Sequence, residues 1–368
     1  MAEDVYVKLR QQLDQYSVGF PATASGVEMK ILQKLFTPAA AEMYLDLTLL
    51  LESPADVARR TDRDPEATAA LLDQMAEHGL IFRLRRGGAA KYAASPFVVG
   101  FFEFQVKDMD RELARLVDEY MEEAFHKSIA GTVTFMRPIP VNRSLDVSHP
   151  VATYEDARAI MKNQKLIAVT ECVCRKQQGL LDKGCGKPIE VCFCFGSHAE
   201  YYLSRGMARK VSLEEALVIL DRSEEAGLVT QPYNTVNPGG LCNCCGDCCG
   251  VLRALNKLPR PVEAVVSNYF AEVEAQLCVG CETCLERCQM KAISMSEEGT
   301  AEIDLDRCLG CGLCVTTCAA GAMRLRPKPA DRRQSPPATG AEQMAELARR
   351  RGRSLSPLFP RSKTGSSA

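Results

Sequence analysis

A single cysteine pattern occurs twice near the C-terminal end of the chain and restricts the local fold more than any other feature. In each copy, three cysteines stand at every third position and a fourth follows four positions later. The second copy begins thirty positions after the first, at 308 instead of 278. Gly280 and Gly310 occupy equivalent places, where a tight loop calls for a positive φ or leaves no room for a side chain. The eight cysteines are Cys278, Cys281, Cys284 and Cys288, then Cys308, Cys311, Cys314 and Cys318.

This spacing resembles that of the bacterial two-cluster ferredoxins, in which the fourth cysteine of each run binds the other cluster. The resemblance implies two [4Fe-4S] clusters and one-electron transfer at low potential. One cluster would be held by Cys278, Cys281, Cys284 and Cys318, and the other by Cys308, Cys311, Cys314 and Cys288. Structural zinc usually takes two separated C-x2-C pairs, and disulfide frameworks belong to small secreted chains, so neither fits the repeat. The usual proline after the fourth cysteine is replaced by Gln289 and Ala319, which predicts a less rigid turn.

Ten further cysteines lie between residues 172 and 249, too dense for ordinary core packing. Three interpretations stay open: one or two more iron–sulfur clusters, a dithiol redox site, or structural zinc. Cys194 and Cys244 are the expected spares, because adjacent cysteines such as Cys244 and Cys245 point in different directions. We expect one site to use Cys172, Cys174, Cys185 and Cys192, and a second to use Cys242, Cys245, Cys248 and Cys249.

The chain of 368 residues is long enough for several domains, and its pattern predicts an α+β protein. We expect an N-terminal helix in 1–27, a winged-helix-like domain in 28–100, and a helix and linker in 101–150. A cysteine-rich α/β domain follows in 151–265, then a dicluster ferredoxin domain in 266–326 and a basic disordered tail in 327–368. The tail holds nine Lys or Arg against three Asp or Glu, and a short helix fits near 341–351. It is either a solvated extension or a docking arm for an acidic redox partner.

The order of helices and strands in residues 28–94 resembles a winged helix-turn-helix. Helices are predicted from Pro38, Pro54 and Pro65, since proline suits the first turn. Two strands would follow around Gly87 and Gly88. The third helix carries acidic side chains and no Lys or Arg, whereas an element lying against phosphates should be basic. DNA binding is therefore not expected, and the domain is better suited to docking a protein.

Other features of the chain limit the remaining function classes. The first residues show no basic stretch followed by an apolar run, and no run of eighteen apolar residues occurs, so neither a signal peptide nor a membrane span is expected. Free thiolates and low-potential clusters indicate a reducing cytoplasm. Neither a Walker A sequence nor a GxGxxG motif opening a helix is present. The oligomeric state is not predicted.

Residues 28–326 also resemble a family of bacterial 4Fe-4S ferredoxin-domain proteins. The resemblance rests on the segments at 171–176, 183–185, 192–196, 224–229, 242–250 and 267–273. It implies iron–sulfur cofactors and leaves the substrate open. Our first hypothesis is an electron-transfer protein that serves a partner oxidoreductase through its two clusters and a further central site. The alternatives are a redox-sensing winged-helix regulator and a reductase with its active site at the central cysteines.

Overall fold

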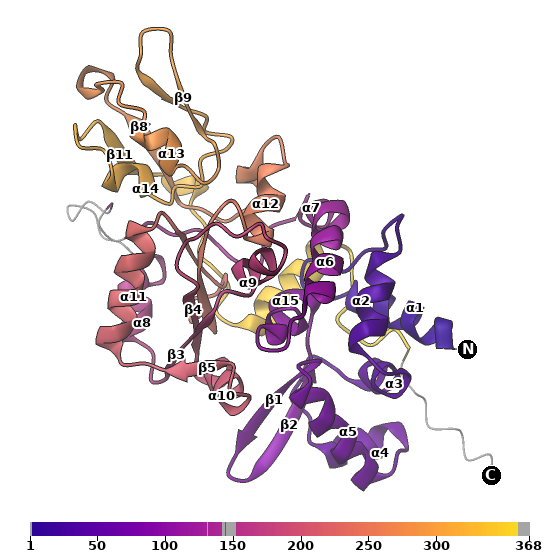
Figure 1. Ribbon diagram of the computed structural model, residues 1–368. Helices are drawn as coiled ribbons and strands as arrows, with labels where there is room; N and C mark the ends of the chain where they lie inside the picture. Colours follow the sequence, from indigo (N-terminus) through magenta and orange to yellow (C-terminus); the bar gives the residue numbers. More distant parts are fainter. Residues whose placement is uncertain (1, 131, 142–143, 145–151, 360–368) are drawn as a thin grey trace.

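The protein is described here by a computed structural model that covers residues 2–130, 132–141, 144 and 152–359. Helices and antiparallel strands are mixed along the chain, in agreement with an α+β protein. The ferredoxin repeat stands at one end of the molecule and the β1–β2 hairpin at the other (Figure 1). Within the described part of the chain, no helix is long and apolar enough to cross a membrane.

The N-terminal region contains five helices and a hairpin, and the helices from Pro38, Pro54 and Pro65 precede the hairpin as predicted, whereas α2 was not predicted. Three of the helices begin with a capping residue followed by proline: Thr37, Ser53 and Asp64 each accept a hydrogen bond from the first turn. The helices and strands are α1 (Ala2–Leu13), α2 (Val27–Leu35), α3 (Pro38–Asp46), α4 (Pro54–Thr61), α5 (Pro65–Glu77), β1 (Ile81–Arg86) and β2 (Ala89–Ala94).

Two arginines of the basic hairpin, Arg83 and Arg85, are paired with carboxylates of helix α5. The side chain of Arg83 is only 1% exposed and contacts Asp73 at 3.1 Å and Glu77 at 2.6 Å. Arg85 binds the same Asp73 carboxylate at 3.0 Å. Two of the cations that could have contacted phosphates are therefore already paired within the domain.

A short helical region connects the N-terminal helices to the sheet. It consists of α6 (Arg111–Tyr120) and α7 (His126–Ile129). One side of α6 is apolar and buried, as its periodicity predicts. Asp118 on α6 binds Gln178 and Lys183 at 2.8 and 2.9 Å and Arg253 at 2.9 Å, so that one carboxylate joins three segments.

The central domain is built on a five-stranded sheet in the order β5-β3-β4-β7-β6. All its pairings are antiparallel, so the α/β interpretation of residues 151–265 is wrong in strand direction. The consecutive strands β3 and β4, and β6 and β7, are neighbours, whereas β5 and β6 lie at opposite edges of the sheet. The strands are β3 (Ile167–Glu171), β4 (Glu190–Phe195), β5 (Ala208–Lys210), β6 (Val229–Pro232) and β7 (Gly240–Cys244). The helices are α8 (Ala157–Lys162), α9 (Val173–Leu180), α10 (Gly196–Ser204), α11 (Leu213–Glu225) and α12 (Gly250–Asn256).

The cysteine repeat folds into two short helices and two small antiparallel sheets. β8 (Tyr269–Val273) pairs with β11 (Met323–Pro327), and β9 (Ile293–Met295) pairs with β10 (Ala301–Ile303). Helices α13 (Thr283–Arg287) and α14 (Leu313–Thr316) each contain the third cysteine of a copy. The third cysteine of each copy, Cys284 and Cys314, is buried within this unit.

The described part of the basic C-terminal segment is packed on the protein, which corrects the expectation of a disordered tail. Helix α15 (Gly340–Arg350) buries Leu347 and Ala348, and Gln343 donates a 2.7 Å hydrogen bond to the carbonyl of Phe135. Arg351 and Arg353 bind Asp14 at 3.0 and 2.9 Å. Residues 360–368, with two of the predicted tail cations, lie outside the described residues.

Candidate iron–sulfur and cysteine sites

The eight cysteines of the repeat surround two separate cavities. One is lined by Cys278, Cys281, Cys284 and Cys318, and we call it the outer site. The other is lined by Cys288, Cys308, Cys311 and Cys314, and we call it the inner site. The fourth cysteine of each copy lies beside the first three of the other copy, as in the crossed ligand scheme.

Backbone N–H groups donate hydrogen bonds to two thiol sulfurs at each site. At the outer site, Ala301 donates to Cys278 at 3.5 Å and Ala322 to Cys318 at 3.2 Å. At the inner site, Ala271 donates to Cys308 at 3.4 Å and Ala292 to Cys288 at 3.3 Å. Ala271 and Ala301 are thirty positions apart, and so are Ala292 and Ala322. The repeat therefore includes these hydrogen bonds as well as the cysteines. Such donors favour thiolate over thiol and tune the potential of a bound cluster.

The loops around the sites have no room for side chains at their glycines. Gly310 has a φ of +66°, and a Cβ there would lie 2.2 Å from the carbonyl oxygen of Tyr269. Gly280 has a φ of +67°, and its Cβ would lie 2.7 Å from the carbonyl oxygen of Gly299. The backbone therefore approaches closely at the same place in both copies.

The two sites differ in their exposure. Cys281 of the outer site is exposed, and a hydrogen bond from Thr283 lowers its pKa. At the inner site, burial raises the pKa of Cys308 and Cys314, and that of Cys311 to about 12. These thiols would become thiolates only together with a compensating metal. The outer site thus faces solvent and the inner site faces the protein.

Comparison with known proteins agrees with this geometry. Residues 277–322 match the 4Fe-4S dicluster domain family. The chain therefore contains a ferredoxin-type 4Fe-4S dicluster domain. No curated protein and no solved structure matches it. The ferredoxin domain accounts for eight of the eighteen cysteines, and the ten others lie outside the matched residues.

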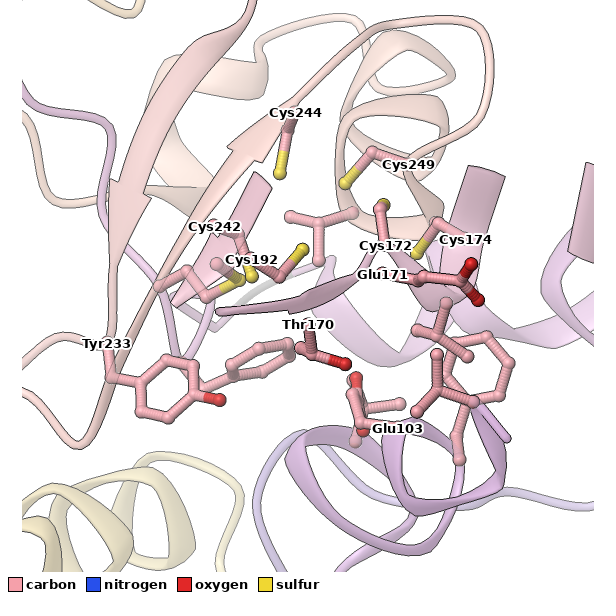
Figure 2. A pocket seen from close by; sticks show the side chains of 18 of the residues that line it. Glu103, Thr170, Glu171, Cys172, Cys174, Cys192, Tyr233, Cys242, Cys244 and Cys249 are labelled. Carbon is pink, nitrogen blue, oxygen red and sulfur yellow. The ribbon is translucent and has the colours of Figure 1, made fainter. Parts of the chain in front are cut away.

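Six of the other ten cysteines form a closed ring in the central domain, here called the thiol ring. Each thiol lies within hydrogen-bonding reach of two others, and their sulfurs turn toward a common space (Figure 2). The order around the ring is Cys172, Cys174, Cys249, Cys244, Cys242 and Cys192.

The positions of the ring cysteines follow from strand periodicity. Residues two apart on a strand point to the same face, so Cys242 and Cys244 of β7 lie on one side of the sheet. Cys192 is on the neighbouring strand β4 and lies beside Cys242. Cys172 and Cys249 precede helices α9 and α12, which bring the remaining thiols over the same face.

The ring borders a cavity of about 60 Å³, several times the roughly 10–15 Å³ that one water needs. Most of its other walls are apolar, among them Val98, Phe102 and Met121. Glu103 also lines it; burial raises the pKa of Glu103 to about 8, while a hydrogen bond from the Gly100 N–H opposes this rise. An apolar space of this size with six sulfurs at its edge suits a metal–sulfur group better than water.

Three further cysteines form a second and tighter group, here called the thiol trio. The sulfurs of Cys185, Cys245 and Cys248 all lie within 4.8 Å of one another, and Cys185 and Cys245 are 3.7 Å apart. Cys245 and Cys248 are buried, whereas Cys185 is partly exposed. The trio joins the loop after α9 to the loop between β7 and α12.

Arg175 lies between the thiol ring and the thiol trio. Its guanidinium donates to the carbonyls of Pro188 and Asn243 at 2.8 and 2.7 Å. Burial alone would lower the pKa of Arg175, but nearby thiols of both groups raise it above its usual value. One buried cation therefore offsets negative charge at both sets of sulfurs.

The expected grouping of the central cysteines is corrected by this arrangement. Cys185 was assigned with Cys172, but it lies with Cys245 and Cys248. Cys244 was expected to be a spare, but it is a member of the ring. Cys194 borders the ring cavity and hydrogen-bonds none of its thiols. The sequence signal for Cys244 is the Cys-x-Cys spacing at 242–244. This spacing places both thiols on the same face only if the segment is a strand.

Proposed function

We propose that this protein carries single electrons between a partner oxidoreductase and a metal–sulfur site in the thiol ring, by way of the ferredoxin domain. A bound [4Fe-4S] cluster supplies one-electron chemistry, and the family match supports that cofactor. The observation that carries the proposal is the arrangement of the sites. The outer four-cysteine site contains the exposed Cys281, whereas every cysteine of the inner site and of the six-cysteine ring is buried or partly buried.

The contact between the ferredoxin domain and the central domain supports this route. Gln289 follows Cys288 of the inner site and accepts a 2.7 Å hydrogen bond from the N–H of Gly246. Gly246 belongs to the loop 244–249, which supplies cysteines to both the ring and the trio. A Cβ at Gly246 would lie 2.6 Å from the Gln289 carbonyl, so glycine permits the close approach. The loop thus places the inner site against the central cysteines.

The N-terminal domain is proposed to be a winged-helix-like docking module, not a DNA reader. Arg83 and Arg85 of its hairpin are paired with carboxylates of α5, and α5 itself contains no Lys or Arg. Phosphate neutralisation supplies most of the affinity of DNA-binding proteins. A gel shift of promoter-region DNA at low salt, with oxidised and with reduced protein, would contradict this assignment.

Iron quantitation with Mössbauer and EPR spectroscopy on anaerobically purified protein tests the main proposal. The ferredoxin domain should hold about eight irons in two cubane clusters, and the thiol ring should add more. Cys249→Ser should lower the iron content without changing the EPR signals of the two ferredoxin clusters. Cys194→Ser is the matched control, because its thiol lies outside the ring. Fewer than about eight irons with no cubane signal, or an unchanged iron content in Cys249→Ser, would overturn the proposal.

A reductase is the second candidate, because the ring cavity is lined by apolar side chains and contains a carboxyl group. Glu103 and Tyr233 border it opposite the sulfurs (Figure 2). In that case the electrons would reach a substrate in the cavity instead of leaving through a partner. Turnover that survives substitution of the ring cysteines would exclude this candidate.

A further inference from the structure

The thiol trio is too compact for the kind of cluster that the ferredoxin domain binds. Within the described part of the chain, it is the single group of three or more Cys, His, Asp or Glu with ligand atoms within 4.8 Å of one another. The cysteines of the outer and inner sites do not meet that limit, although each set surrounds one cavity. The trio therefore has a smaller centre than an iron–sulfur cube.

The spacing of the trio fits one tetrahedral metal ion. A zinc–sulfur bond of about 2.3 Å and a tetrahedral angle place two thiolates about 3.8 Å apart. The sulfurs of Cys185 and Cys245 are 3.7 Å apart, and Cys248 is within hydrogen-bonding reach of both. One pair of sulfurs thus has the separation that a single ion requires, and the third sulfur lies within 4.8 Å of both.

The fourth corner has no protein ligand among the described residues. No further Cys, His, Asp or Glu offers an atom within 4.8 Å of the three sulfurs. Asp247, between Cys245 and Cys248 in the sequence, instead binds Lys187 at 3.1 Å and is 59% exposed. Structural zinc sites are closed by four protein ligands, whereas sites with three leave a position for water or another small ligand.

The loop that carries Cys245 and Cys248 borders a groove between the central and ferredoxin domains. Gly246 and Asp247 line this groove together with Cys288 and Gln289 of the ferredoxin domain. The partial exposure of Cys185 gives an ion and a small ligand access to the trio. Arg175 lies within hydrogen-bonding reach of Cys245 and offsets the net negative charge of three thiolates around a divalent ion.

We propose that Cys185, Cys245 and Cys248 bind one thiophilic divalent ion, such as Zn²⁺, through three thiolates, with the fourth coordination position open to a small exogenous ligand. Soft thiolate ligands select such ions. The site would join the loop after α9 to the loop before α12 and stand beside the inner iron–sulfur site. It is separate from the thiol ring in its residues and in its metal.

Zinc K-edge X-ray absorption on the full chain, purified without oxygen after growth with added Zn²⁺, tests this proposal. The spectrum should show three sulfurs at about 2.3 Å and one oxygen or nitrogen. Zinc content by mass spectrometry should be about one ion per chain and should fall at least about tenfold in Cys185→Ser. Cys194→Ser, the matched control, should keep its zinc. Added cyanide should replace the light atom in the first shell.

The contrary outcomes separate this inference from the proposed function. Four sulfurs around zinc would exclude the open position. Absence of zinc, with a loss of several irons in Cys185→Ser, would show that the trio belongs to a cluster. Equal loss of zinc in Cys194→Ser would show that the ion is not held by the trio. Iron and EPR signals are measured on the same samples, so failure of the zinc site leaves the test of electron transfer intact.

Discussion

At the scale of single residues, the thirty-residue repeat of the ferredoxin domain includes both the cysteines and the residues that surround them. The cysteines recur at this interval, and so do the alanines that donate N–H groups to the sulfurs and the glycines inside the loops. An N–H donor is independent of side-chain type, so the sequence alone does not reveal it. The glycines could be anticipated, because a cysteine loop around a cluster has little space.

Replacing Gly310 by alanine should disrupt the inner site. A Cβ at this position would lie 2.2 Å from the Tyr269 carbonyl, so strand β8 would have to move. Gly321→Ala is the matched control, since its φ of +63° is similar but nothing lies within 4 Å of its Cβ. The control should lose about 1 kcal/mol of stability from the positive φ. Gly310→Ala should lose more stability and about four irons, those of one cluster; equal iron content and equal melting temperatures in the two variants would contradict the close approach.

The grouping of the central cysteines marks the limit of sequence reasoning at this scale. Clustering of ten thiols indicated metal or redox chemistry, but the partners depend on tertiary structure. Cys244 and Cys245 are neighbours in the chain, yet one turns to the ring and the other to the trio. Spacing alone does not decide between them, because strand β7 ends at Cys244 and the alternation of sides ends with it.

At the scale of helices and strands, local signals predicted the N-terminal elements well. A capping residue followed by proline gives both a side-chain acceptor and a preset φ at the first turn. The helices predicted from Pro38, Pro54 and Pro65 begin at these residues. The directions of the central strands were not predictable in the same way, because an apolar strand has the same pattern in parallel and antiparallel sheets.

Glu77→Ala should weaken the contact between α5 and the hairpin. It removes the 2.6 Å partner of Arg83, whose side chain is 1% exposed, and leaves that cation with Asp73 alone. We expect the free energy of unfolding to fall by about 1 kcal/mol. The loss is no larger because the Glu77 side chain is half exposed and solvent weakens the ion pair. Gln74→Ala, an exposed position on the same helix, is the control. Chemical denaturation of both variants measures the difference between their free energies of unfolding. Equal values would show that Glu77 does not stabilise the contact between α5 and the hairpin.

At the scale of the whole molecule, a few polar residues hold together segments that are far apart in the sequence. Asp118 is an example, since it joins α6 to the Gln178–Lys183 segment and to α12. Burial would raise the pKa of Asp118, but Lys183, Gln178 and Arg253 lower it below the usual value. The carboxylate is therefore charged and paired at neutral pH. Such long-range pairs have no local sequence signal.

Asp118→Ala should destabilise the packing of the N-terminal region on the central domain. Its side chain is 9% exposed, and its removal leaves Arg253, 16% exposed, with Glu122 alone. We expect a loss of about 2–3 kcal/mol. Asp182→Ala removes an ion pair with Arg111 in which the carboxylate is 78% exposed, and should cost less than about 1 kcal/mol. Thermal unfolding without oxygen compares the two, and equal melting temperatures would exclude a special role for Asp118.

The C-terminal segment shows how composition can mislead about a whole molecule. Many arginines and few apolar residues are typical of a disordered tail, but a single buried face is enough to hold α15 in place. Leu347 is 2% exposed, and Arg351 and Arg353 contact Asp14 near the other end of the chain. Four of the cations of the predicted tail, Arg349, Arg350, Arg351 and Arg353, are thus on or beside a helix that packs on the protein, which leaves less positive charge for a docking arm.

Leu347→Ala decides between a packed and a disordered segment. If α15 packs, the truncation leaves a cavity and should cost about 2–4 kcal/mol, and trypsin should cleave within 349–353 much faster than in the wild type. Leu358→Ala is the matched control, because Leu358 lies in the same segment but is 41% exposed; it should leave both measurements nearly unchanged. A disordered segment has no contact to lose, so it would give the same melting temperature and the same cleavage rate in the wild type and both variants. That result would show that the basic segment is a free arm and that Arg351 and Arg353 do not contact Asp14.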